Sequence, residues 1–100
     1  MDILSIQKEV RESKVFFTEH ALRRMAMRDI NVYEVFETIL SGEIIEEYPT
    51  DKYSPSCLIF GETKGKRPLH VVCSLPPRVR IVTVYQPDPD EWINNRRRKK

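Results

Sequence analysis

The chain has 100 residues, of which 40% are hydrophobic and 32% are charged, and its formal net charge is +2. This composition is too apolar for a disordered chain and fits one small domain. No apolar run approaches the roughly 20 residues of a membrane span, and the first residues lack the basic and apolar segments of a secretory signal, so we expect a cytoplasmic protein without a membrane partner.

The first part of the chain predicts two helices in succession. Apolar residues recur at helical spacing over residues 2–13, which indicates a first helix. Thr18 suits the N-cap of a second helix over residues 19–28, because its hydroxyl can accept from the free backbone N–H groups and Glu19 then complements the helix start.

A third helix is the clearest expected element. Asn31 and Glu34 form a capping-box pattern at its start, and Gly42 is placed to end it. Between them lies an amphipathic stripe of apolar residues, which indicates that one side of the helix is buried. The stripe consists of Val32, Val35, Phe36, Ile39 and Leu40.

After Gly42 the pattern changes to short β-rich runs, separated by segments with Pro, Gly and Lys that are typical of turns. Short connections favour antiparallel neighbours, since parallel pairing needs a crossover. We therefore expect an α+β fold, with the N-terminal helices packed on one face of a roughly four-stranded antiparallel sheet. Its strands are expected at Glu43–Tyr48, Ser56–Gly61, Leu69–Ser74 and Val79–Tyr85.

The C-terminal residues predict one last ordered turn. Asp88 and Pro89 resemble a helix start, followed by two acids, and Trp92 is expected to pack back on the sheet. The five final residues, 96–100, are all basic, and we expect a mobile tail there, outside a single domain of residues 1–95. That domain alone carries 12 basic and 15 acidic side chains.

Charge is segregated within this expected domain. Acids are concentrated from Glu34 to Asp51, whereas residues 62–80 carry five basic side chains against Glu62 alone. A dipolar surface of this kind can bind a polyanion on one side without being basic overall. The acidic block is either a surface that a partner recognises or an ordinary solvated face.

The two cysteines, Cys57 and Cys73, each lie in an apolar, strand-like run. In a chain without a secretory signal this favours two buried thiols over a disulfide. His70 and Cys73 are three residues apart on an expected strand, where they point to opposite faces, and the chain has no CxxC or HxxxH pair. We expect no metal site and no cofactor.

One side of the second helix is basic. At 100° per residue, His20 lies on the same side as Arg23, Arg24 and Arg28, while the opposite side is apolar. Arginine matches phosphate oxygens with two parallel hydrogen bonds, so this side is a candidate phosphate-binding surface. The alternative is a solvated basic face on a surface helix.

The last two expected strands place His70 on a half-polar face. If residues 75–78 form a four-residue loop, Ser74 pairs with Val79 and His70 lies opposite Thr83, beside the basic loop Lys64–Arg67. These side chains then either form a site or simply pack across strands, and a register change of one residue would invert both faces. The expected helix-facing side holds Leu69, Val71, Cys73, Val82 and Val84, and the other side holds His70, Val72, Ser74, Ile81, Thr83 and Tyr85.

Four ordered segments resemble the domain-of-unknown-function 4258 family. They cover about residues 15–93, and the family is similar to the RelE-like and BrnT-like toxins of toxin–antitoxin pairs, small α+β ribonucleases that cut messenger RNA. The resemblance implies a RelE-like fold, with RNA and an antitoxin protein as expected partners. The segments are Phe17–Ile30, Ser41–Tyr48, Arg67–Val72 and Thr83–Trp92.

The residues fit the chemistry that this resemblance implies. RNA cleavage by the 2′-hydroxyl needs a base, an acid and cations on the phosphate. We expect a toxin-like, metal-independent ribonuclease; the alternatives are a non-catalytic RNA- or protein-binding module and, with least support, an enzyme acting on a small metabolite. The candidate catalytic residues are His70, His20 and Tyr85, and the candidate substrate-binding residues are Arg24, Arg28, Arg67 and Thr83.

Overall fold

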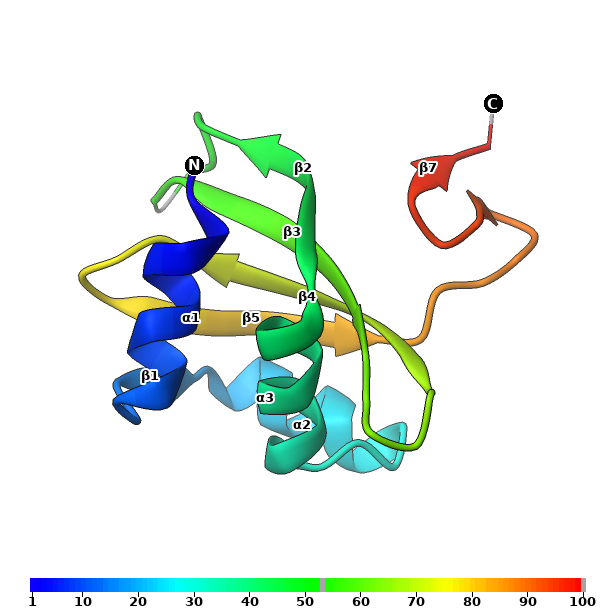
Figure 1. Cartoon of the computed structure of the whole chain (residues 1–100), viewed down its shortest axis with the longest axis horizontal. Coiled ribbons are helices and arrows are strands. Elements are labelled where there is room, and N and C mark those ends of the chain that lie inside the picture. The colour runs from blue at the N-terminus through cyan, green and yellow to red at the C-terminus, as the bar shows by residue number, and fades with distance from the viewer. Residues whose placement is uncertain (53, 100) are drawn as a thin grey trace.

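Three helices lie on one face of a five-stranded mixed sheet in the computed structural model, which describes residues 1–52 and 54–99 (Figure 1). Within these residues no helix has the length and apolar character needed to cross a bilayer. The elements in chain order are α1 (Ile3–Arg11), β1 (Val15–Phe17), α2 (Glu19–Met27), α3 (Val32–Ser41), β2 (Glu43–Tyr48), β3 (Ser56–Glu62), β4 (Pro68–Ser74), β5 (Val79–Tyr85), β6 (Trp92–Ile93) and β7 (Arg97–Arg98).

The sheet has the strand order β1-β5-β4-β3-β2. Strands β2 to β5 are antiparallel, and the expected α+β class is confirmed. The expectation of a four-stranded, fully antiparallel sheet is wrong, because β1 adds a fifth strand parallel to β5, with Val15 opposite Val79 and Phe17 opposite Ile81. A run of three residues between two helices carries no local strand signal, and its partner lies far along the chain.

The helices begin where their capping residues predict. Thr18 Oγ1 accepts a 3.0 Å hydrogen bond from the Ala21 backbone, and Asn31 and Glu34 form both hydrogen bonds of a capping box. Gln7 of α1 is buried and donates to the carbonyl oxygen of Ile39, at 3.0 Å. This bond satisfies a carbonyl in the last turn of α3 and fixes α1 against it.

The core lies between the helices and the sheet. Cys57 and Cys73 face each other across β3 and β4 within it, and both are buried free thiols, as expected. Residues of the helices and of the strands pack together there, and each helix turns one apolar side to the sheet. The buried residues are Ile6, Val10, Ala21, Met25, Ile30, Val35, Ile39, Cys57, Ile59, Leu69, Val71, Cys73, Val79, Ile81 and Val84.

The register of β4 and β5 differs from the predicted one. His70 lies opposite Tyr85, not Thr83, and Thr83 lies opposite Val72. The loop of residues 75–78 was predicted to pair Ser74 with Val79, and the actual pairing is offset from this. The offset brings the imidazole and the phenol directly side by side.

An irregularity in the same strand pair changes which residues face the helices. The register shifts between Val72 and Cys73, so that Cys73 lies opposite Ile81. Ile81 is therefore fully buried in the core, whereas Val82 is 39% exposed. The predicted faces of Ile81 and Val82 are reversed, because a β-bulge interrupts the strict alternation on which the prediction depended.

The turn predicted after Asp88 is present, and a hairpin that was not predicted follows it. The Asp88 carbonyl accepts from the backbones of Glu91 and Trp92, and β6 begins at Trp92. Three residues join β6 to β7: Asn94 and Asn95 have φ values of 51° and 62°, and the Arg96 backbone donates to the Ile93 carbonyl at 3.0 Å, which closes the turn. We call residues 92–98 the C-terminal hairpin.

The C-terminal hairpin contains most of the predicted tail. Figure 1 shows the chain leaving the end of β5 and turning back into the hairpin, away from the three helices. Arg97 and Arg98 pair with Ile93 and Trp92, and Lys100 lies outside the described residues. The mobility of residues 96–100 stays a prediction.

Candidate functional site

Three aromatic side chains form a row across the sheet. Phe60, His70 and Tyr85 lie opposite one another on β3, β4 and β5. The ring centroids of Phe60 and His70 are 6.0 Å apart, and those of His70 and Tyr85 are 5.2 Å apart. Their neighbours Leu69 and Val71 point into the core, so this aromatic row lies on the face that the helices leave free.

His70 is the centre of the row and has no exposed surface. Its Nε2 lies 2.6 Å from the Asn95 carbonyl oxygen, and its Nδ1 lies 3.2 Å from the Tyr85 hydroxyl. A carbonyl only accepts, so Nε2 carries the hydrogen and Nδ1 accepts from Tyr85. Burial lowers the pKa of His70, which favours the neutral ring in this position.

The C-terminal hairpin covers this row. Trp92 is 5% exposed, and its ring stands perpendicular to that of His70 with centroids 4.5 Å apart. Two arginines of the hairpin stack on aromatic rings: Arg98 over Trp92 at 4.7 Å and Arg96 over Phe60 at 4.8 Å. The row is thus enclosed between the sheet and the hairpin.

Two ion pairs hold the hairpin to the acidic edge strand β2. Arg98 donates from Nε and Nη2 to the two carboxylate oxygens of Glu46, at 2.8 and 3.1 Å, and Arg96 pairs with Glu43. Burial raises the pKa of Glu46, but hydrogen bonds from Arg98 and Tyr48 outweigh it, so the pKa ends below its ordinary value. Part of the acidic block is therefore taken up by the chain's own basic end.

A cavity of about 380 Å³ adjoins Tyr85 at the end of β5. Three guanidinium groups and two carboxylates line it, and two of the guanidinium groups also pair with carboxylates outside the lining, Arg98 with Glu46 and Arg67 with Glu34. Such a cavity suits an anionic group of phosphate size, because guanidinium groups bind phosphate oxygens in pairs. The lining residues are Arg28, Arg67, Tyr85, Gln86, Asp88, Glu91, Trp92 and Arg98.

The arginines of this cavity are held by backbone contacts. Arg28, just after α2, donates to the Val84 carbonyl at 2.7 Å. Arg67, just before β4, donates to the carbonyls of Asp29 and Arg28 at 2.8 and 2.9 Å. Arg67 therefore ties the turn after α2 to the sheet, while Arg28 is exposed and reaches the cavity from the helix end.

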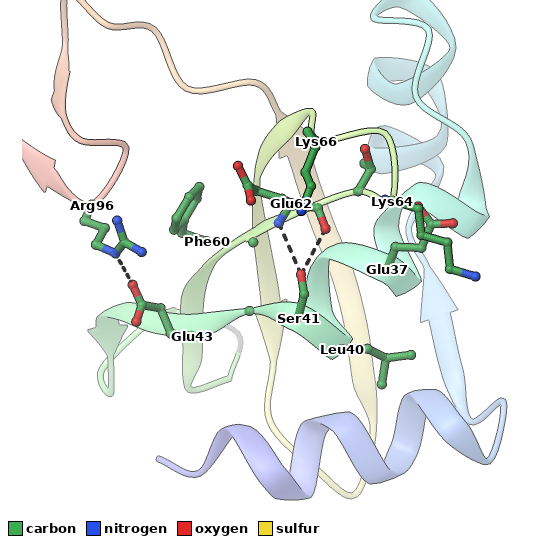
Figure 2. A pocket seen from close by; sticks show the side chains of 12 residues that line it. Glu37, Leu40, Ser41, Glu43, Phe60, Glu62, Lys64, Lys66 and Arg96 are labelled. Carbon is green, nitrogen blue, oxygen red and sulfur yellow. Dashed lines mark hydrogen bonds and ion pairs between the residues drawn. The ribbon is translucent and has the colours of Figure 1, made fainter.

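A larger cavity, of about 560 Å³, lies on the other side of the hairpin (Figure 2). Figure 2 shows Phe60 beside the Arg96–Glu43 pair, and Ser41 bonded to the backbone of Glu62. The lining of this larger cavity has three basic and three acidic side chains, so their formal charges cancel. We place the candidate site at the smaller cavity, because Tyr85, which contacts His70, lines that one together with three guanidinium groups. The charged lining residues are Lys64, Lys66, Arg96, Glu37, Glu43 and Glu62.

Comparison with known proteins identifies the family. Residues 17–86 match the family model described as "Domain of unknown function (DUF4258)". The chain belongs to the DUF4258 family. The matched range contains the aromatic row with Arg28 and Arg67, and it ends before the C-terminal hairpin. No curated protein and no solved structure matches this chain.

The structure brings four predicted site residues of this DUF4258 protein together. His70 and Tyr85 are in contact, and Arg28 and Arg67 line the adjoining cavity. Thr83 is half-buried on β5, two residues from Tyr85, and is not part of the cavity lining.

The two remaining predicted residues lie elsewhere. His20 and Arg24 are exposed on α2, and their side chains form no hydrogen bond or ion pair with the rest of the described chain. Helix α2 packs Ala21 and Met25 into the core on the opposite face of the sheet from His70. His20 and His70 therefore belong to different layers of the molecule.

The part of the hairpin in the site was not predicted from the sequence. Asn94 and Asn95 tolerate positive φ better than most residues, so they were a readable signal for a tight hairpin turn. Nothing local predicts that Asn95 then bonds His70 or that Arg98 reaches Glu46, because these contacts join segments far apart in sequence.

Proposed function

We propose that this DUF4258 protein is a toxin-like, metal-independent ribonuclease with a RelE-like or BrnT-like role, cutting messenger RNA in the cytoplasm and controlled by an antitoxin protein. The observation that carries the proposal is the 3.2 Å contact between His70 Nδ1 and the Tyr85 hydroxyl at the wall of the three-arginine cavity. An imidazole, a phenol and guanidinium groups converge there, which is the set of groups that metal-free RNA cleavage uses.

The proposed reaction transfers two protons at one phosphate. The 2′-oxygen attacks phosphorus as a base removes its proton, the bond to the 5′-oxygen breaks, and an acid protonates that oxygen. The products are a 2′,3′-cyclic phosphate and a 5′-hydroxyl. His70 and Tyr85 are the proposed proton-transferring groups, and Arg28 with Arg98 would stabilise the charge that builds on the phosphate oxygens.

The test is cleavage of single-stranded RNA by purified protein in the presence of a metal chelator. We expect fragments that end in a 2′,3′-cyclic phosphate. His70→Gln and Tyr85→Phe should each lower the rate by about 100-fold or more, which is the usual contribution of a proton-transfer group. Arg28→Gln should weaken RNA binding, while Arg23→Gln, on the exposed side of the same helix, is the matched control for charge.

Cleavage that survives the combined His20→Ala and His70→Ala substitutions would contradict the proposed proton transfers. Induced expression in a bacterium gives an independent readout, since a toxin should arrest growth and the His70→Gln variant should not. Thermal unfolding of each variant separates a lost reaction from a lost fold.

A non-catalytic RNA-binding module is the second candidate function. The observation that favours it is the enclosure of His70, which has no exposed surface and both ring nitrogens engaged. This candidate predicts RNA affinity that falls steeply with salt and no new fragments.

A further inference from the structure

We infer that the aromatic row of Phe60, His70 and Tyr85 is a binding site for unstacked bases of single-stranded RNA, which the C-terminal hairpin occupies in the free protein and which RNA opens by displacing the hairpin. The inference rests on the proposed function for its ligand, RNA, and adds how that ligand is bound and how access to it is controlled.

The row has the form of a stacking platform. Adjacent aromatic side chains on the open face of a sheet are a recurrent means of binding the bases of single-stranded RNA. In the free protein the Trp92 ring lies against His70 with centroids 4.5 Å apart, and it is almost fully buried there. The Trp92 ring stands perpendicular to the His70 ring, and it occupies space over the row that a stacked base would need.

Cations flank the row at both ends. The Tyr85 end opens on the cavity of Arg28 and Arg67. The Phe60 end opens on the larger cavity, whose lining includes Lys64 and Lys66 as well as three acidic side chains (Figure 2). A strand whose bases stack along the row can therefore place phosphates near basic side chains on either side.

The hairpin is attached to the platform by side chains and one backbone carbonyl. Strands β6 and β7 pair only with each other in the described chain, and neither extends the five-stranded sheet. The polar contacts are the Asn95–His70 hydrogen bond and two ion pairs, and the ring contacts are Trp92 against His70 and Arg96 over Phe60. Arg96 and Arg98 are 53% and 61% exposed in these pairs, so salt and competing anions weaken them.

RNA phosphate competes for the same two guanidinium groups. Arg98 grips Glu46 through two hydrogen bonds, and a phosphate offers the same paired oxygens. When Arg96 and Arg98 exchange carboxylates for phosphates, the hairpin leaves the row and carries two positive charges to the RNA. While the hairpin is closed, Glu43 and Glu46 stay neutralised, and His70 and Phe60 are buried.

The apparent affinity for RNA therefore depends on the fraction of molecules in which the hairpin is open. A ligand that binds only the open form binds more tightly when the closed form is destabilised. Glu46→Gln weakens the Arg98 pair without altering the row. The matched control is Glu47→Gln, which removes the same charge from the next residue on β2. The Glu47 carboxylate pairs with the N-terminal amine and not with the hairpin.

The experiment uses the full chain and the fluorescence of Trp92, the only tryptophan. The probe is a single-stranded RNA of about 12 nucleotides, within the usual range of such sites. We expect a red shift of the emission on adding RNA, and a smaller shift in Glu46→Gln without RNA. Glu46→Gln should bind RNA about tenfold more tightly than Glu47→Gln.

Unchanged Trp92 emission on RNA binding, or equal affinities of the two variants, would overturn the inference even if the protein cleaves RNA. A red shift and tighter binding without any fragments would support the inference and overturn the proposed cleavage. A protein that binds no RNA in either variant would overturn both.

Discussion

At the scale of single residues, the site depends on which atom of His70 carries the hydrogen. The Asn95 carbonyl accepts from Nε2, so the Tyr85 hydroxyl donates to Nδ1. Among the described side chains no buried nitrogen or oxygen lacks a partner. His70 is therefore fully satisfied in the closed arrangement, and because the Asn95 acceptor is a backbone carbonyl, only displacement of the hairpin frees Nε2.

The pKa of His70 predicts how stability depends on pH. Burial lowers this pKa below the ordinary value of 6.5. As the pH falls through about 6.5, the unfolded chain gains a proton that the folded chain does not bind, so stability falls until the lowered folded pKa is reached. We expect the melting temperature to fall as the pH drops below about 6.5, and His70→Gln to lose this part of the decline in thermal unfolding followed by circular dichroism.

Glu46 also makes stability depend on pH, but in a more acidic range than His70 does. Its pKa is lowered from 4.5, so its stabilisation is present above that value and is lost as the pH falls through the folded pKa. A decline near pH 6 that is identical in wild type and His70→Gln would assign the effect to other groups.

At the scale of elements, α3 and β3 approach each other closely at a glycine. A Cβ atom on Gly61 would lie 2.0 Å from the backbone oxygen of Thr38, and one on Gly42 would lie 2.5 Å from the same atom. Neither glycine has a positive φ, so space rather than backbone freedom requires them. The end of α3 can therefore lie directly on β3, which leaves the other face of the strand for Phe60.

Gly61→Ala should destabilise the fold by about 1–3 kcal/mol, because the methyl group forces backbone atoms apart. Gly65→Ala is the control, since a Cβ there would meet only the Thr63 hydroxyl at an ordinary 3.7 Å. Urea unfolding measures both. Equal midpoints for the two variants would show that the sheet yields easily at Gly61.

Local patterns predicted the elements well and their assembly only in part. The caps at Thr18 and Asn31 and the strands β2 to β5 could be read from the sequence, because caps, turns and alternation act over a few residues. The strand β1 and the bulge near Cys73 could not, since both are set by pairing between distant segments. The face of His70 and Tyr85 was predicted, and the hairpin over it was missed.

At the scale of the whole molecule, the segregated charges of the sequence meet in the fold. The basic C-terminal end returns to the acidic strand β2, where Arg96 and Arg98 pair with Glu43 and Glu46. The DUF4258 match ends at residue 86, so the five-stranded sheet lies almost wholly inside the family range and the hairpin lies outside it.

Ending the chain after Glu91 should remove the hairpin without unfolding the sheet, because no strand of the five-stranded sheet pairs with residues 92–98. We expect cooperative urea unfolding at a lower midpoint. The pKa of His70, followed by NMR, should move back toward its ordinary value as the ring becomes hydrated. Loss of the cooperative transition would show that Trp92 belongs to the core.

The parallel pairing of β1 and β5 has a consequence for how a nascent chain acquires its structure. Val15 pairs with Val79, and the Thr18 backbone donates to Ile81 at 3.1 Å. The edge strand β1 is synthesised early, but it can pair with β5 only after most of the polypeptide has been synthesised. Such long-range closure slows folding and prolongs the exposure of apolar surface, so the early half of the chain is the part with most need of a chaperone.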